Sequence, residues 1–362
     1  MAHVATITID YTKVPGDLTD YVGLIVPDAS AGYSALYALC LEGGGDIRLF
    51  KSDDTTELAR EIVTFSVSAE TGEIHYKYSG TLSSSVDTDI HVYADGSSSD
   101  YAVGATYGRN AVWVDYGGVW HLGEATTTTV DSTGNGNDGT KTSATDPLSQ
   151  AEQIGNGQEA QTAGKLINNG SNTTIDNIWA GGGTMTMWLR VNSNTALQGS
   201  GSSWFMSKDN SGAAGWLIFT DSSRNLEFYH PFSGTAGRWN VGTQMGTGTM
   251  KYVALAYDKD SSSNNAQYYL NGAAVTTTEQ VSPSGSAVSD AAYDYALFSS
   301  PDGTRTLNGA MDEVRLRNST LSANWITTEY NNQNSYSTFY SVAAVAGGSA
   351  AQAARRGVIM MM

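Results

Sequence analysis

The residues best suited to bind an ion lie between positions 131 and 140, in the run Asp-Ser-Thr-Gly-Asn-Gly-Asn-Asp-Gly-Thr. Three Gly, two Asn and two Asp in ten residues predict a tightly turned loop, because these residues adopt or tolerate positive φ angles. Four oxygen-bearing residues occupy alternate ligand positions of the Ca²⁺-loop pattern: Asp131, Thr133, Asn135 and Asn137. The twelfth position is Thr142, where an EF-hand needs a bidentate Glu. Two interpretations remain: a Ca²⁺ loop completed by a distant carboxylate, or a polar turn.

The composition narrows the possible partners. The chain has 362 residues and a net charge of −17, which disfavours nucleic acid, since phosphate binding needs clustered Lys and Arg. No apolar run approaches the roughly 20 residues of a membrane span. The N-terminus alternates like a strand and resembles no signal peptide, so we expect synthesis in a cytoplasm without export. The single cysteine, Cys40, is expected to be a small buried hydrophobe.

Short alternating runs separated by turn residues predict strands through most of the chain. In the first hundred residues they are Ala5–Ile9, Tyr21–Val26, Asp46–Phe50, Ile62–Val67, Ile74–Tyr78 and Ile90–Tyr93. Asn271-Gly272 directly follows the strand Gln267–Leu270 and predicts a two-residue hairpin. Only Tyr33–Leu41 and Ser322–Asn332 have a helical pattern.

These elements predict two domains and a tail. A small β-sandwich occupies residues 1–103, a Gly- and Ser-rich linker 104–110, and a larger two-sheet domain 111–334. Residues 335–362 are rich in small side chains and end in an apolar run, so they cannot form a core of their own. They form either a disordered tail or an extended arm that docks on a neighbouring subunit.

Residues 111–334 contain a series of ordered motifs: Val119-Trp-His-Leu-Gly-Glu124, Met185-Thr-Met-Trp188, Tyr252-Val-Ala-Leu-Ala-Tyr257 and Leu307–Arg317. In these motifs the segment resembles the laminin-G-like (LamG), concanavalin-A-like jelly-roll domains. The N-terminal part contains Ile9-Asp-Tyr-Thr-Lys-Val-Pro15, Gly45-Asp-Ile-Arg48 and the strand Ile90-His-Val-Tyr93. With these motifs, residues 4–103 resemble a small domain of unknown function that often precedes such jelly rolls in phage structural and bacterial surface proteins. The resemblance thus implies an all-β chain: a small N-terminal β-sandwich, a concanavalin-A-like jelly roll and a C-terminal extended tail.

In the jelly-roll family, the Asp-containing loop commonly meets the late Asp-Glu-Val strand at a Ca²⁺ ion. The resemblance therefore implies a structural calcium site formed by Asp131, Asn135, Asn137, Asp312 and Glu313. Such an ion would bind ligands from both the first loop and the last strand of the domain and so hold them together.

Aromatic side chains offer a second kind of site, because exposed rings stack on sugar faces. Trp204 and Trp216 are expected to lie in the core. Trp239, in a Gly-rich stretch that indicates a loop, is the best candidate for an exposed ring, with Tyr229 and His230 nearby.

Nothing in the sequence predicts catalysis. Glucanase relatives place carboxylates on alternate positions of a strand, whereas Asp312 and Glu313 are adjacent and would face opposite ways. The five histidines, at positions 3, 75, 91, 121 and 230, show no metal-ligand spacing. We therefore predict a non-enzyme.

The first functional hypothesis is a virion structural protein of a bacteriophage: a capsid decoration, fibre or tail appendage with an outward jelly roll that binds host glycans. Its partners would be other virion proteins or further copies of itself. The alternative is a carbohydrate-binding adhesin on a bacterial surface, against which the missing export signal counts.

Overall fold

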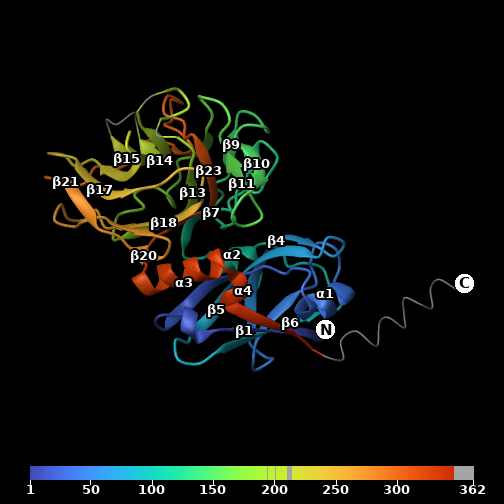
Figure 1. The fold of residues 1–362 in the computed structure, drawn as a ribbon. Helices are drawn as coiled ribbons and strands as arrows, with labels where there is room; N and C mark the ends of the chain where they lie inside the picture. The colour runs from blue at the N-terminus through green and yellow to red at the C-terminus, as the bar shows by residue number, and fades with distance from the viewer. Residues whose placement is uncertain (194, 200, 210–213, 346–362) are drawn as a thin grey trace, which may run out of the picture. The chain divides into compact units, whose positions relative to one another are not determined.

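A computed structural model describes residues 1–193, 195–199, 201–209 and 214–345, which divide into two units (Figure 1). The first unit combines Met1–Val114 with the chain from Thr327 onward, and the second is Asp115–Ile326. The second unit is therefore inserted into the sequence of the first. This division differs from the predicted one, which assigned residues 327–334 to the jelly roll and separated 335–362 as a tail.

Helices are few and short among the described residues. They are η1 (Tyr11–Lys13), η2 (Ala31–Tyr33), α1 (Ser34–Leu39), α2 (Arg109–Val112), α3 (Ala323–Asn334) and α4 (Tyr336–Phe339). The two predicted helices are confirmed as α1 and α3, whereas α2 begins within the predicted linker. No described helix has the length and apolar character needed to cross a membrane.

Seven described strands of the first unit form one antiparallel sheet, in the order β2-β5-β4-β3-β6-β1-β24. They are β1 (Ala2–Ile9), β2 (Leu18–Ile25), β3 (Arg48–Lys51), β4 (Glu57–Ser66), β5 (Thr71–Leu82), β6 (Thr88–Ala94) and β24 (Tyr340–Ala344). Strand β4 joins the two halves, since its first residues pair with β3 and residues 59–66 pair with β5. Cys40 is buried in this unit, as expected.

The C-terminal strand completes one edge of this sheet. β24 pairs antiparallel with β1, from Ala5 opposite Ala344 to Ile9 opposite Tyr340. Since β1 pairs with β6 on its other side, β24 makes the first strand of the chain an internal one. Residues 336–344 are therefore not a free tail, while 346–362 lie outside the described residues.

Side chains from the same C-terminal segment cover the other edge, strand β2. The buried Asn332 amide accepts a hydrogen bond from the Leu24 N–H (2.7 Å) and donates one to the Leu24 carbonyl (2.9 Å). Just beyond the end of β2, the Val26 N–H donates to the Tyr340 hydroxyl (2.8 Å). Asn332 and Tyr340 thus satisfy the backbone groups that a missing neighbouring strand would have paired.

The second unit is a sandwich of two antiparallel sheets. One has the order β10-β11-β23-β13-β18-β19-β20, with β7 also paired to β23, and the other β21-β17-β16-β15-β14-β22-β12-β9-β8. The strands are β7 (Tyr116–Trp120), β8 (Thr128–Thr129), β9 (Gly139–Lys141), β10 (Leu148–Ala151), β11 (Asn156–Glu159), β12 (Ile167–Gly170), β13 (Gly183–Val191), β14 (Ser203–Asp209), β15 (Gly215–Thr220), β16 (Asn225–His230), β17 (Gly237–Gln244), β18 (Lys251–Tyr257), β19 (Gln267–Leu270), β20 (Ala273–Ala274), β21 (Thr277–Val281), β22 (Tyr295–Leu297) and β23 (Gly309–Arg317).

The inner faces of the two sheets enclose one aromatic-rich core. Trp179 lies edge-on to Trp216, Phe228 and Tyr257, with ring centroids 5.2–6.3 Å apart. The predicted hairpin is confirmed: Asn271 and Gly272 connect β19 to β20 with φ angles of 49° and 76°. Positive φ at both residues is the geometry of a two-residue hairpin turn. The all-β, jelly-roll architecture predicted from the sequence is therefore confirmed.

The edge-covering role of Asn332 predicts a stability effect. Replacing it with Ala leaves a buried N–H and carbonyl of Leu24 without their side-chain partner, so Asn332→Ala should lower the free energy of unfolding by about 2–3 kcal/mol. Asn331→Ala is the matched control on the same helix, because Asn331 is only half-buried and donates one bond, to the Lys13 carbonyl. Urea denaturation measures both, and equal losses would contradict the role of Asn332.

Candidate ligand-binding groove and predicted calcium loop

A groove of about 720 Å³ lies on the outer face of the second unit's larger sheet. Its walls follow two rows of cross-strand neighbours. In one row Trp204 (β14) lies opposite Phe219 (β15), and in the other Leu217 (β15), Tyr229 (β16) and Arg238 (β17) lie side by side. On β15 the two rows are two residues apart, or ~7 Å, so the Leu217 and Phe219 side chains project to the same face. The result is a platform of aromatic rings on neighbouring strands.

The aromatic walls remain partly exposed. Trp204, Phe219 and Tyr229 are half-buried, and the Trp204 and Phe219 ring centroids are 6.5 Å apart at an interplanar angle of 49°. Burial raises the pKa of the Tyr229 hydroxyl, with Asp209 adding to the effect. Tyr229 is therefore a neutral hydrogen-bonding group throughout the ordinary pH range.

Three charged residues also line the groove. The Arg238 guanidinium lies 5.8 Å from the Phe219 ring centroid and is paired with the buried Glu227. Arg305 reaches the groove because its carbonyl accepts a hydrogen bond from the Trp204 N–H (2.9 Å), and its guanidinium donates to the Ser202 hydroxyl (3.3 Å). Asp221 accepts from the Ser223 and Asn225 N–H groups at 2.7 and 2.9 Å. The groove thus combines apolar ring faces with fixed hydrogen-bonding groups.

The structure corrects the expectation for Trp204, which was assigned to the core together with Trp216. Trp216 is buried, but Trp204 faces the groove. The reason is a β-bulge: the pairing of β14 with β15 shifts between Trp204 and Met206. A bulge breaks the alternation of inward and outward side chains, so Phe205 and Met206 are both buried.

The expectation for Trp239 is also wrong. Its Gly-rich surroundings form strand β17, and its ring is fully buried against Phe228 and Tyr257, at centroid distances of 5.7 and 4.9 Å. Gly237 makes room for this ring, because a Cβ at that position would come within 2.3 Å of it. The glycine that suggested a loop is therefore a packing requirement of the core, and the neighbouring Arg238 faces the groove instead.

The other two predicted ligand-binding residues separate. Tyr229 lines the groove, whereas His230, the next residue on β16, points into the core and is 1% exposed. Its Nδ1 lies 3.0 Å from the Pro231 carbonyl oxygen, which fixes the proton on Nδ1. Burial, reinforced by the charge of Lys259, lowers the pKa of His230 to about 3. His230 is thus a neutral core residue that supports the groove from beneath.

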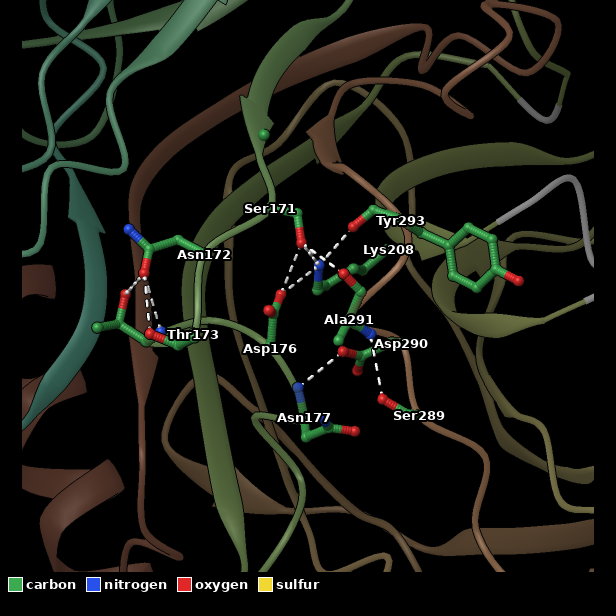
Figure 2. Close-up of polar contacts among 12 residues, drawn as sticks. Ser171, Asn172, Thr173, Asp176, Asn177, Lys208, Ser289, Asp290, Ala291 and Tyr293 are labelled. Atoms are coloured by element: carbon green, nitrogen blue, oxygen red, sulfur yellow. Dashed lines mark hydrogen bonds and ion pairs between the residues drawn. The ribbon is translucent and has the colours of Figure 1, made fainter.

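A buried ion pair anchors strand β14, which carries Trp204. Figure 2 shows the Lys208 ammonium between Asp176, Ser171 and the main chain at Tyr293. Lys208 Nζ is 2.8 Å from Asp176 Oδ1 and 3.1 Å from Ser171 Oγ, and it also donates to the Tyr293 carbonyl. These three acceptors use all three ammonium protons, as a buried lysine requires.

A second buried carboxylate lies beside this ion pair (Figure 2). Asp290 Oδ1 accepts from the Asn177 N–H at 2.7 Å, and burial raises the pKa of the Asp290 carboxyl. Lys259 Nζ, 2.6 Å from Asn177 Oδ1, approaches the same loop. Charged groups thus hold the loops around residues 171–177 and 289–293 to strand β14.

The loop predicted to bind calcium is built around Asp131. Its carboxylate accepts four hydrogen bonds: from the N–H groups of Val119, Thr133 and Asn137, and from the Thr133 hydroxyl, at 2.7–3.1 Å. Asn135 and Asn137 both donate their amide protons to the Gly117 carbonyl, so the structure brings these three predicted ligands into one buried or half-buried turn. The buried Oδ1 of Asn137 has no hydrogen-bond partner among the described residues.

The two predicted ligands from the late strand have other partners. Asp312 accepts a hydrogen bond from the Ile154 N–H at 2.8 Å. Glu313 bonds to His121 and Arg315, and its φ of 52° coincides with a β-bulge in β23. Because of this bulge, Asp312 and Glu313 are not neighbours in a regular strand, so the alternation of side chains alone does not fix their directions. Calcium binding at the Asp131 loop stays a prediction.

Comparison with known proteins identifies the class of the second unit. Residues 167–327 match the family model described as the concanavalin A-like lectin/glucanases superfamily, Laminin_G_3. The resemblance stated from the sequence is thereby confirmed for this part of the chain. The match covers less than half of the chain and does not extend to the N-terminal unit. No curated protein sequence matched the chain.

Solved structures give weaker similarities. A Trypanosoma rangeli sialidase in complex with the inhibitor DANA has a TM-score of 0.44 at 11% identity, with 60% of this chain and 33% of that one covered. The binding domain of Paraclostridial Mosquitocidal Protein 1 has a TM-score of 0.46 at 11% identity, with 62% of this chain and 52% of that one covered. The botulinum neurotoxin serotype G binding domain has a TM-score of 0.45 at 11% identity, with 59% of this chain and 50% of that one covered. This chain thus spans a third to about half of their lengths, and similarity at this level carries no argument about function.

The buried His230 predicts a specific pH dependence. Its pKa is about 3 in the folded chain and ordinarily 6.5, so the unfolded chain binds the extra proton. The free energy of unfolding therefore includes the full contribution of the neutral His230 ring above pH 6.5, and this contribution is lost as the pH falls toward 3. His230→Phe should therefore reduce the slope of unfolding free energy against pH in this window by up to ~1.4 kcal/mol per unit. Urea denaturation at pH 7, 6, 5 and 4 measures it; parallel slopes for the two proteins would contradict the assignment.

The calcium prediction has its own test. If Ca²⁺ occupies the Asp131 loop, EDTA should lower the melting temperature of the second unit, and added Ca²⁺ but not Mg²⁺ should restore it. Asp131→Asn should abolish the response to Ca²⁺. The prediction fails if EDTA does not change the melting temperature and elemental analysis finds no calcium in the protein. The loop would then be a hydrogen-bonded polar turn without an ion.

Proposed function

We propose that the chain is a non-enzymatic glycan-binding protein whose jelly roll holds a sugar in the groove lined by Trp204, Phe219 and Tyr229. The observation that carries the proposal is the placement of three partly exposed rings on adjacent strands of one sheet face. A sugar ring has an apolar face that packs on an aromatic ring and hydroxyls that need fixed donors and acceptors. The groove offers both.

Its size and lining support a small polar ligand with apolar faces. Ligand pockets of ~300–1,000 Å³ typically combine aromatic walls with a few placed polar groups. Here Arg238, Arg305 and Asp221 supply donors and acceptors at fixed positions. The matched family includes lectins by its description, which agrees with a sugar as the ligand.

Binding without cleavage is supported by the acidic residues of the groove. Glycosidases of most families place two carboxylates across the scissile bond, one as acid and one as nucleophile or base. Among the described residues that line the groove, Asp221 is the carboxylate, and backbone N–H groups and the Asn225 amide hold its two oxygens. Asp221 is thus bound to the loop that carries it, as suits a residue that shapes the site.

For the biological setting we retain the virion hypothesis: a phage decoration, fibre or tail protein that displays the jelly roll to host glycans, with other virion proteins or copies of itself as partners. The alternative is a bacterial surface adhesin with the same groove. Mass spectrometry of density-purified particles decides between them, because a virion component occurs at a fixed copy number per particle. Recovery from cell surfaces or medium alone would favour the adhesin.

The groove predicts which substitutions affect glycan binding. On an array of bacterial surface and host glycans, followed by titration with the soluble form of the best-bound glycan, Trp204→Ala and Tyr229→Ala should each weaken binding at least tenfold. Each substitution removes a ring face, while half-buried positions leave the fold intact, as circular dichroism would verify.

Tyr11→Ala provides the control, since Tyr11 is an exposed aromatic residue of the first unit, 40% accessible. It should bind like the unmodified chain. Unchanged affinity in the Trp204 and Tyr229 variants would place any glycan site elsewhere, and an array without a bound glycan would refute the proposal.

A further inference from the structure

Two histidines that are 88 positions apart in sequence stack on one face of the first unit's sheet. His3 on β1 lies opposite Tyr93 on β6, and Thr6 lies opposite His91. The His3 ring is 4.3 Å from the His91 ring and 5.0 Å from the Tyr93 ring, at interplanar angles of 30° and 20°. Residues 91 and 93 share a face because they are two apart.

A β-bulge brings His3 to the same face. Positions 3 and 6 differ by an odd number and would face opposite sides of a regular strand. The pairing of β1 with β6 shifts between His3 and Ala5, and the extra residue restores the shared face. The histidine spacing in the sequence gave no sign of a cluster, because the two residues meet only through the pairing of β1 with β6.

The turn between β3 and β4 adds a carboxylate. Asp54, at φ 56°, directs Oδ1 to within 2.5 Å of His91 Nδ1, and the same oxygen accepts a hydrogen bond from the Tyr93 hydroxyl at 2.8 Å. One nitrogen from each histidine and one Asp54 oxygen all lie within 4.8 Å of one another. Tyr93 therefore orients the carboxylate toward the two imidazoles.

We propose that His3, Asp54 and His91 form a binding site for a divalent transition-metal ion such as Zn²⁺, Ni²⁺ or Cu²⁺. Two imidazole nitrogens and one carboxylate oxygen are the ligands these ions prefer, with remaining positions for water. The set differs from the all-oxygen ligands that Ca²⁺ requires, so this site is independent of the predicted calcium loop.

The local surroundings suit such an ion. Side chains that hold ligands by hydrogen bonds are a regular feature of metal sites, and Tyr93 does this for Asp54. His3 Nε2 lies 3.0 Å from the Ala5 carbonyl oxygen, the kind of backbone contact that fixes an imidazole tautomer. The Asp54 side chain is 51% exposed and that of His91 16%, so an ion enters from solvent. A metal ~2.1 Å from each ligand needs ligand atoms ~3.4 Å apart. Metal binding therefore requires the exposed Asp54 to rotate and the stacked rings of His3 and His91 to turn until their lone pairs converge on one ion.

Calorimetric titration tests the site in the full chain after EDTA stripping and buffer exchange. With ZnCl₂ and separately NiCl₂, we expect one equivalent bound, and no corresponding heat with CaCl₂ at this site. His3→Ala combined with His91→Ala should abolish that equivalent. Bound Cu²⁺ should give an electron paramagnetic resonance spectrum with coupling to two nitrogen atoms, lost in the same variant.

Asp54→Asn is a second test that does not depend on correct folding of the double variant. It should fold normally, because Asp54 is exposed and Asn tolerates its positive φ. It should weaken Zn²⁺ binding at least tenfold. Asp53→Asn is the matched control on the same turn: its carboxylate is bonded to Thr55 and Thr56, and it should bind like the unmodified chain. The proposal fails if no Zn²⁺ binds, or if Asp54→Asn and the double variant retain unchanged affinity.

Discussion

Unpaired strand edges are the constraint on which the first unit depends. Each backbone N–H and carbonyl at a sheet edge needs a partner, and residues 332–344 provide partners for the outer sides of β1 and β2, with β24 as the new edge strand. That segment adds β24 beside β1 and places Asn332 and Tyr340 along β2. The first and last described strands of the chain are therefore neighbours, and the second unit is inserted between them in sequence.

In the second unit, side chains that alternate along each strand divide between the core and the groove. Along β16 and β17, Phe228 and Trp239 pack into the core while Tyr229 and Arg238 line the groove. The aromatic core determines where the strands lie, and the strands determine the spacing of the outward rings. The buried Lys208–Asp176 pair fixes β14 further, because a desolvated ammonium is stable only with all its acceptors in place.

Much of the fold could be predicted from local patterns. Alternating strands, the Asn271-Gly272 turn and the jelly-roll motifs all depend on neighbours in sequence, and each is confirmed. β24 could not be predicted, since a small-residue strand acquires its pairing only from β1. Gly237 was misleading because glycine is typical both of loops and of strands that pass a large ring. Its role becomes clear only when Trp239 is seen beside it.

The candidate sites were harder to predict than the fold for a related reason. Tyr229, predicted from the sequence as a ligand-binding residue, lines the groove. Trp204 and the His3–His91 pair sit at β-bulges, where the period of two on which sequence interpretation relies is broken. Asp131 was predicted to be a calcium ligand because its surroundings are rich in Asn and Gly, but such residues form a turn whether or not an ion is present. Local chemistry thus indicated the residue types, and long-range pairing determined which of them meet.

The inserted arrangement has a consequence for synthesis on the ribosome. Residues 1–114 emerge first, but the strand and side chains that close their sheet follow only after the whole of Asp115–Ile326. At ~5–20 residues per second, the nascent first unit waits on the order of 10–40 s with open edges. The inserted jelly roll, contiguous in sequence, can fold within that interval. The order of synthesis therefore favours folding of the inserted jelly roll before the sheet of the first unit receives its last strand.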